Sequence, residues 1–141
     1  MDILFDYIYQ INWFTVVIAS CVGMLISAVW YSDAFFGQVW RKSIGLKKKD
    51  IENPKTDVGL IIAFITLLIM TAATAVLIDV LKISGAWSGL LFGLLVGFGL
   101  LATNNGMHKL YEQRPFSLFV VTAVGDILTM SAIGVILALW K

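Results

Sequence analysis

Four long apolar segments, separated by short polar ones, dominate the pattern of hydrophobic and polar positions. They run from about residue 11 to 31, 58 to 81, 86 to 107 and 116 to 140. A helix needs about 20 mostly apolar residues to cross the hydrocarbon core of a bilayer, and each segment is long enough. The shorter, alternating segments of an outer-membrane barrel do not occur. The pattern therefore predicts an all-α integral membrane protein, a four-transmembrane-helix bundle that forms a single domain over residues 1–141.

The connection after the first span has an amphipathic pattern. Its apolar residues recur at helical spacing: Phe35, Phe36, Val39, Trp40 and Ile44. Ser32 and Asp33 could cap a helix there, and Gly45 suits its C-terminal end. These features predict a short amphipathic interfacial helix over residues 33–45, followed by an exposed polar turn over residues 46–57. This connection is either an ordinary interfacial linker or has a regulatory lipid-binding role.

The composition supports a membrane location. Of the 141 residues, 60% are hydrophobic and 13% are charged, and the mean hydropathy is +0.91. Soluble domains are roughly 45–50% apolar and about 25% charged. A globule of this size could not bury so much apolar surface away from water. We therefore expect the lipid bilayer to be the principal partner of the chain.

Charge and residue counts argue against several classes of function. The net charge of +1, from ten basic and nine acidic residues, provides no electrostatic footprint for nucleic acid. The single cysteine, Cys21, cannot form an intrachain disulfide, and the single histidine, His108, is too few for a histidine-rich metal site. We expect no metal and no cofactor. The known catalytic templates do not match either, so an enzyme is the least supported class.

The basic residues predict the orientation of the chain. Eight of the ten lie in the connections after the first and third spans: Arg41, Lys42, Lys47, Lys48, Lys49, Lys55, Lys109 and Arg114. Lys82 and Lys141 fall on the other side. Because basic connections stay in the cytoplasm, both termini are expected outside. At the outer end of the second span, the three-residue spacing of Asp79 and Lys82 predicts an interfacial ion pair.

Small residues recur at helical spacing in two of the spans. The third span has glycines at every fourth position: Gly85, Gly89, Gly93 and Gly97. The first span has a milder version in Ala19, Gly23 and Ser27. Such a glycine zipper lets another helix backbone approach closely. The pattern leaves two interpretations open, namely helix packing within one chain, or an interface with a partner membrane helix or a second copy in a homo-oligomer.

One acidic residue, Asp126, lies close to the middle of the fourth span. A charged carboxylate at that depth is costly, and such residues are functional candidates by default. Thr122 and Thr129 lie on the same helical face, so their hydroxyl groups could satisfy the carboxyl group, which could also be protonated. Asp126 is therefore either a site for a proton, a cation or a substrate, or a hydrogen-bonded structural acid.

The third span ends in a polar run. At 100° per residue, Asn104 returns to nearly the angular position of Gly93 and Gly97, and His108 follows one turn later. The glycine face thus becomes polar towards the cytoplasm. A polar cavity open to the cytoplasm could be lined by Asn104, Asn105, His108, Asp126 and Ser27. The alternative is an ordinary helix–helix hydrogen bond for the asparagines and a solvated histidine.

The first third of the chain carries a recognisable pattern. Asn12-Trp13 opens a span that closes on Trp30-Tyr31-Ser32, and Phe36-Gly37 and Trp40 follow. This pattern resembles the bacterial membrane-protein family known as domain of unknown function 1761. Relatives often have a proline after the Trp-Tyr-Ser element, where this chain has Asp33. The resemblance implies a bacterial cytoplasmic-membrane protein of four helices, and it brings no assigned activity or catalytic residues.

Two functional hypotheses follow from these patterns. In the first, the chain is a small integral membrane protein that binds or passes a small solute or a proton through a polar site around Asp126 and Asn104, and the identity of the ligand is open. In the second, it is a structural or accessory subunit that assembles through its glycine-rich helix face.

Overall fold

The computed structural model describes residues 2–52 and 54–140, which form helices joined by short turns, with no strand among them. Lys141, which the charge pattern assigns to the outer side, lies outside the described residues. Four helical stretches are long and apolar enough to cross a membrane: α2 (Trp13–Trp30), α5 (Pro54–Val80), the continuous run of α6 (Ala86–Val96), η1 (Gly97–Ala102) and α7 (Thr103–Tyr111), and α8 (Phe116–Leu139). The predicted all-α fold with four transmembrane-length helices is therefore confirmed.

Helix α8 lies at the centre of the arrangement. It packs against α6, η1 and α7 on one side and against α2 on the other, while α5 packs mainly on α2. Of the α8 span, 50% is buried, compared with 28% of the α2 and α5 spans and 22% of the span formed by α6, η1 and α7. The residues of α8 are therefore the ones most surrounded by protein.

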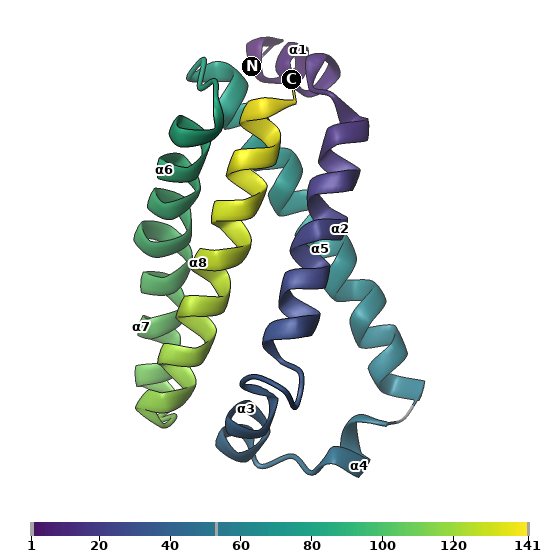
Figure 1. Ribbon diagram of the computed structural model, residues 1–141, viewed down its shortest axis with the longest axis vertical. Helices are drawn as coiled ribbons and strands as arrows, with labels where there is room; N and C mark the ends of the chain where they lie inside the picture. Colours follow the sequence, from purple (N-terminus) through teal and green to yellow (C-terminus); the bar gives the residue numbers. More distant parts are fainter. Residues whose placement is uncertain (1, 53, 141) are drawn as a thin grey trace.

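The packed core lies in the half of the bundle that carries both chain termini (Figure 1). Val16, Ala19, Met130 and Ile133 have no exposed surface, and Ile78 is only 2% exposed. Together with neighbouring apolar residues they form one cluster contributed by α2, α5 and α8. In a bilayer, such a cluster holds the helices together through the van der Waals contacts of its close packing, because lipid chains are as apolar as the side chains. We call this half of the molecule the terminal end.

The opposite half is open. Helix α5 diverges from α8 and α7 towards its first residue (Figure 1). Five apolar residues of this part of α5 are each about half exposed or more: Val58, Leu60, Ile61, Ile62 and Ile65. This half also carries the connections rich in lysine and arginine, and we call it the basic end.

A short helix that the apolar pattern did not predict, α1 (Asp2–Gln10), lies across the terminal end (Figure 1). It contacts α5, and the Tyr7 ring lies 5.4 Å from the Lys82 ammonium group. Lys82 also forms the predicted ion pair with Asp79, at 3.6 Å. At nine residues, α1 is too short to be detected by a search for membrane-length segments.

The amphipathic helix after the first span is α3 (Gly37–Ile44), which begins later than the predicted range of 33–45. Residues 31–36 form turns instead. A Cβ atom on Gly37 would overlap the carbonyl oxygen of Tyr31, because the chain folds back closely at this point. The helix ends as expected at Gly45, whose φ of 76° suits glycine.

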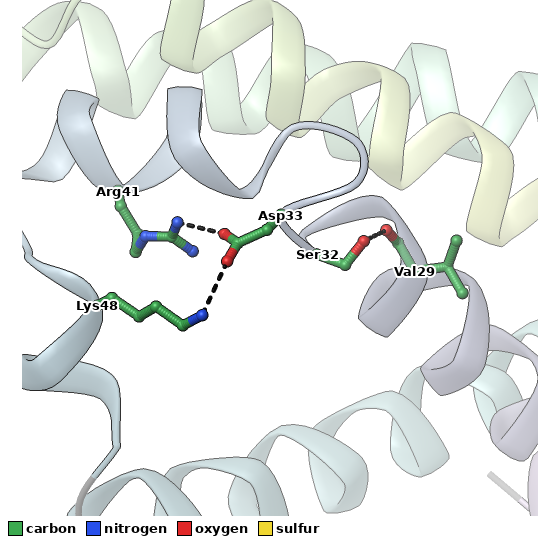
Figure 2. Close-up of polar contacts among 5 residues, drawn as sticks. All are labelled: Val29, Ser32, Asp33, Arg41 and Lys48. Carbon is green, nitrogen blue, oxygen red and sulfur yellow. Dashed lines mark hydrogen bonds and ion pairs between the residues drawn. The ribbon is translucent and has the colours of Figure 1, made fainter.

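The proposed capping residues of this helix have other partners. Ser32 Oγ donates a hydrogen bond of 2.7 Å to the Val29 carbonyl oxygen. Asp33 pairs with Arg41 of α3 and, at 3.3 Å, with Lys48 of α4 (Lys48–Ile51), as Figure 2 shows. Asp33 therefore ties the turn to two helices that follow it.

The segment predicted to be an exposed turn over residues 46–57 is exposed at residues 46–50, but it also contains helical structure. The short helix α4 lies within it, and α5 already begins at Pro54. Proline is well suited to the first turn of a helix, where its missing N–H would have no intrahelical acceptor and its φ is already helical. Pro54 therefore starts the second span instead of separating it from the turn.

Candidate functional site

The glycines of α6 pack directly on α8. A Cβ atom on Gly93 would overlap the Met130 carbonyl oxygen, and one on Gly89 would overlap the Gly134 carbonyl oxygen. Gly97 lies against Ile127, whose Cα atom would be 2.9 Å from the added Cβ. The two backbones therefore touch, as small-residue motifs allow in membranes. An assembly with a partner helix would have to use another face, because α8 occupies this one.

The other small residues of these motifs also have structural roles within this chain. Ala19 and Gly23 of α2 are buried, and a Cβ atom on Gly23 would lie 3.1 Å from Ile133 and 3.2 Å from Thr129. Gly85 differs from the others, since it precedes α6 with a φ of 87° and has no neighbouring atom within 4 Å of its Cβ position. Its role is to allow the turn, because that φ suits glycine.

A π-helical segment, η1, begins at the last of these glycines, Gly97, and interrupts the third span. A π-helical turn accommodates one extra residue and thereby rotates everything that follows. The buried positions of the span show this shift: Gly89, Gly93 and Gly97 are four residues apart, but the next buried residues are Ala102 and Gly106. The face that packs on α8 therefore advances by five residues at η1 and by four elsewhere.

The shift changes which asparagine meets α8. With a uniform period of 3.6 residues, Asn104 and His108 would continue the glycine face. In the structure both are exposed, and Asn105 is turned towards α8 instead. The predicted position of Asn104 and His108 on the glycine face was therefore wrong, and the π-helical segment is the reason.

Asn105 and Asp126 form the polar centre of the site. Asn105 Nδ2 donates a hydrogen bond of 2.5 Å to Asp126 Oδ2. One turn along α8, Thr129 Oγ1 lies 3.5 Å from Ser27 Oγ of α2. Thr122 was the other threonine expected to satisfy the carboxyl group. Its hydroxyl group instead donates a hydrogen bond of 2.9 Å to the Leu118 carbonyl oxygen of its own helix. The carboxyl group is thus satisfied by an amide of another helix.

These residues border a cavity of about 250 Å³. Its polar lining comes from three helices: Ser27, Asn105, Asp126 and Thr129. Its apolar lining is contributed by α5 and η1: Leu67, Met70 and Leu101. Among residues 2–52 and 54–140, no group of three or more His, Cys, Asp or Glu residues could hold a metal ion. The cavity is therefore lined by one carboxyl group, one amide and two hydroxyls beside three apolar side chains.

The aromatic end of α2 lies beside this site. Trp30 Nε1 donates a hydrogen bond of 2.9 Å to the Val121 carbonyl oxygen of α8. The Trp30 ring and the Tyr31 hydroxyl both lie against Gly125, at 3.0 and 3.3 Å from its Cβ position. Tyr31 is close enough to Asp126 for the two groups to interact electrostatically. Trp30 therefore holds α2 against α8 one turn from the carboxyl group.

The sequence analysis used Trp30 and Tyr31 only in the pattern that resembles the family, and it connected neither of them, nor Gly125, with Asp126. The available indication was the glycine directly before Asp126 in the fourth span, because a missing side chain at that point leaves space for a large ring from another helix.

The cavity is closed towards the terminal end by the buried cluster. Val16, Ala19 and Ile133 of that cluster have no exposed surface. On the far side of the cluster lies a second, smaller cavity of about 80 Å³, bordered by Gln10, Asn12, Asp79 and other residues at the terminal end. Two polar recesses are thus separated by the apolar core.

Comparisons with known proteins give one match. The family described as "Protein of unknown function (DUF1761)" matches residues 14–138, which include all the residues that line the cavity around Asp126. No curated protein and no solved structure matches the chain. The match covers most of the chain, as the pattern in its first third indicated, and the chain therefore belongs to the DUF1761 family.

Proposed function

We propose that the cavity around Asp126 binds a small solute or a proton within a bacterial inner-membrane protein. The observation that carries the proposal is the hydrogen bond from Asn105 to Asp126 on the wall of an open cavity. A structural acid would be expected to lie in a sealed, close-packed region. Here the acid is beside space large enough for a ligand, and keeping a carboxyl group at this depth is costly without a function.

The chemistry of the lining favours a ligand with a positive charge or a mobile proton. A carboxylate, an amide carbonyl and hydroxyl oxygens are acceptors, and hard cations and ammonium groups bind to oxygen acceptors. Asn105 supplies the amide and orients the carboxyl group through its Nδ2 hydrogen bond. Ser27 and Thr129 supply the hydroxyl groups.

The charge pattern supports access from the cytoplasm. The basic connections lie at the open end of the bundle, and the positive-inside rule places them in the cytoplasm with both termini outside. The buried cluster at the terminal end blocks the opposite route. A water-soluble solute in the cavity would therefore exchange with the cytoplasmic side in this conformation.

The test uses the full-length protein reconstituted in lipid and infrared difference spectroscopy of the Asp126 carboxyl group. Sodium, ammonium and methylammonium salts, and protons, are titrated against the wild type and the Asp126→Asn and Asp79→Asn variants. We expect at least one titrant to change the carboxyl band in the wild type and in Asp79→Asn but not in Asp126→Asn. A carboxyl band that no titrant changes would identify a sealed structural acid and overturn the proposal.

A further inference from the structure

Two walls of the cavity diverge from one another. Helices α5 and α6 are joined by a short turn at the terminal end. With increasing distance from this turn, towards the basic end, α5 lies further and further from α7 (Figure 1). Leu67 and Met70 of α5 form one wall, and Leu101 of η1 and Asn105 of α7 form the other. The cavity therefore lies between two helices that separate progressively towards the basic end.

The open side of the cavity is bordered by apolar side chains. Leu67, Met70 and Leu101 line the cavity itself. Further along the same face of α5, Ala63 and Leu60, four and seven residues before Leu67, are exposed, Leu60 by 51%. In a bilayer such residues contact hydrocarbon chains. The residues named on this border are apolar, and the charged side chain that interacts electrostatically with Asp126 is Lys109 of α7, one turn beyond Asn105.

We propose that the ligand is an amphiphilic amine that enters sideways from the bilayer between α5 and α7. This inference rests on the function proposed above. Its ammonium group binds to the Asp126 carboxylate and the hydroxyl groups of Ser27 and Thr129, and its hydrocarbon part lies against Leu67, Met70 and Leu101. The negative charge of Asp126 matches the ammonium group of such a molecule, and the apolar side chains of the cavity match its hydrocarbon part.

The size of the cavity sharpens the proposal. At about 30 Å³ for a water-sized group, 250 Å³ holds roughly eight non-hydrogen atoms. A ligand that had to fit wholly inside the cavity would be limited to about eight non-hydrogen atoms. A ligand that enters sideways has no such limit, because the end of its chain stays in the bilayer.

The experiment compares alkylamines of increasing length, from methylamine to dodecylamine, on the protein in lipid nanodiscs. The readout is the change in the Asp126 carboxyl infrared band, which Asp126→Asn cannot show and which dodecanol, a neutral control, should not produce. We expect the apparent affinity, referred to the aqueous concentration, to rise about fourfold for each added methylene group through dodecylamine.

A pair of α5 variants tests the route. Leu67→Gln changes a residue of the cavity wall, and Ile69→Gln changes a residue that is 64% exposed on the same helix. We expect Leu67→Gln to weaken dodecylamine binding at least tenfold while methylamine binding stays within about twofold, and Ile69→Gln to leave both unchanged.

The outcomes separate this inference from the function on which it rests. If methylamine changes the band but amines longer than about eight carbons do not, the cavity binds small cations from water and sideways access is overturned. If Leu67→Gln and Ile69→Gln weaken dodecylamine equally, the route is also overturned. If no amine, metal cation or proton changes the band, the proposed function fails together with the inference.

Discussion

Asn105 of α7 donates its 2.5 Å hydrogen bond to Asp126 of α8, although the preceding residue, Asn104, is exposed. The π-helical segment η1, which directly precedes α7, rotates α7 about its axis. This rotation turns Asn105, and not Asn104, towards Asp126. The geometry of the polar centre is therefore determined by the backbone of the third span as much as by the side chains.

Replacement of the two asparagines should have unequal effects. Asn105→Ala removes the donor that satisfies the Asp126 carboxyl group, and a half-buried carboxyl group without its partner should lower the free energy of unfolding by about 1–3 kcal/mol. Asn104→Ala should change it by less than about 0.5 kcal/mol. Reversible unfolding in bicelles measures both. Equal effects of the two substitutions would contradict the register described for α7.

The contact between α6 and α8 predicts a strong dependence on the size of residue 93. Gly93→Ala places a Cβ atom on the Met130 carbonyl oxygen, so the two helices must separate, and we expect a loss of about 1–3 kcal/mol in the free energy of unfolding. Gly59→Ala is the matched control in α5, because its added Cβ would have no neighbour within 4 Å. The control should be neutral or stabilising by up to about 1 kcal/mol.

The indole of Trp30 should contribute to stability through its hydrogen bond. Trp30→Phe keeps an aromatic ring on Gly125 but loses the Nε1 donor to the Val121 carbonyl oxygen, which should cost about 1 kcal/mol. Trp87→Phe changes a tryptophan that is 70% exposed and should have no measurable effect on unfolding. A similar loss in both variants would indicate a general requirement for tryptophan in the bilayer instead of a specific contact.

Asp33 should hold α3 and α4 in place in a pH-dependent manner. Its hydrogen bonds with Arg41 and Lys48 hold its pKa below the ordinary value of 3.8. Because the pKa is lower in the folded state, the stabilising contribution is complete well above pH 4 and is lost as the pH falls through the lowered pKa. At neutral pH, Asp33→Asn should therefore give the segment a mobility that the wild type reaches only in acid.

Hydrogen exchange of the α3 and α4 amides, corrected for the intrinsic effect of pH, measures this mobility. Glu52→Gln removes a nearby acidic charge and serves as the control, for which we expect wild-type exchange. Protection that is unchanged in Asp33→Asn at neutral pH would show that the two ion pairs do not order the segment. High salt should weaken the effect, because Asp33 is exposed and its pairs are screened.

Much of the fold could be predicted because membrane solubility constrains sequence strongly. Apolar segments of about 20 residues have one dominant physical cause, and the described residues contain four helices of the expected length. The ion pair of Asp79 and Lys82 was predictable for a similar reason, since both residues lie on one helical end with a spacing that brings them together.

The details of the site were harder to predict because they depend on departures from regular geometry. A uniform helical period cannot reveal η1. It therefore predicted that Asn104 would face α8, whereas in the structure Ala102 and Asn105 face α8 and Asn104 is exposed. Local patterns also favoured Thr122 as a partner of Asp126, although a threonine in a helix readily donates to a carbonyl oxygen of its own preceding turn. Contacts between distant segments, such as that of Trp30 with Val121, leave no trace in the periodicity.

The one-sided packing of α5 has a mechanical consequence. The helix is clamped near Thr71 and Ile78, which are at most 2% exposed, and its first four turns extend from this point as a lever. A tilt of roughly 10° about Thr71 would displace the other end, about 25 Å away, by about 4 Å. The moving end of α5 adjoins the lysine-rich connection. A small force that the membrane surface exerted on this connection would therefore change the distance between α5 and α7, and with it the access to Asp126.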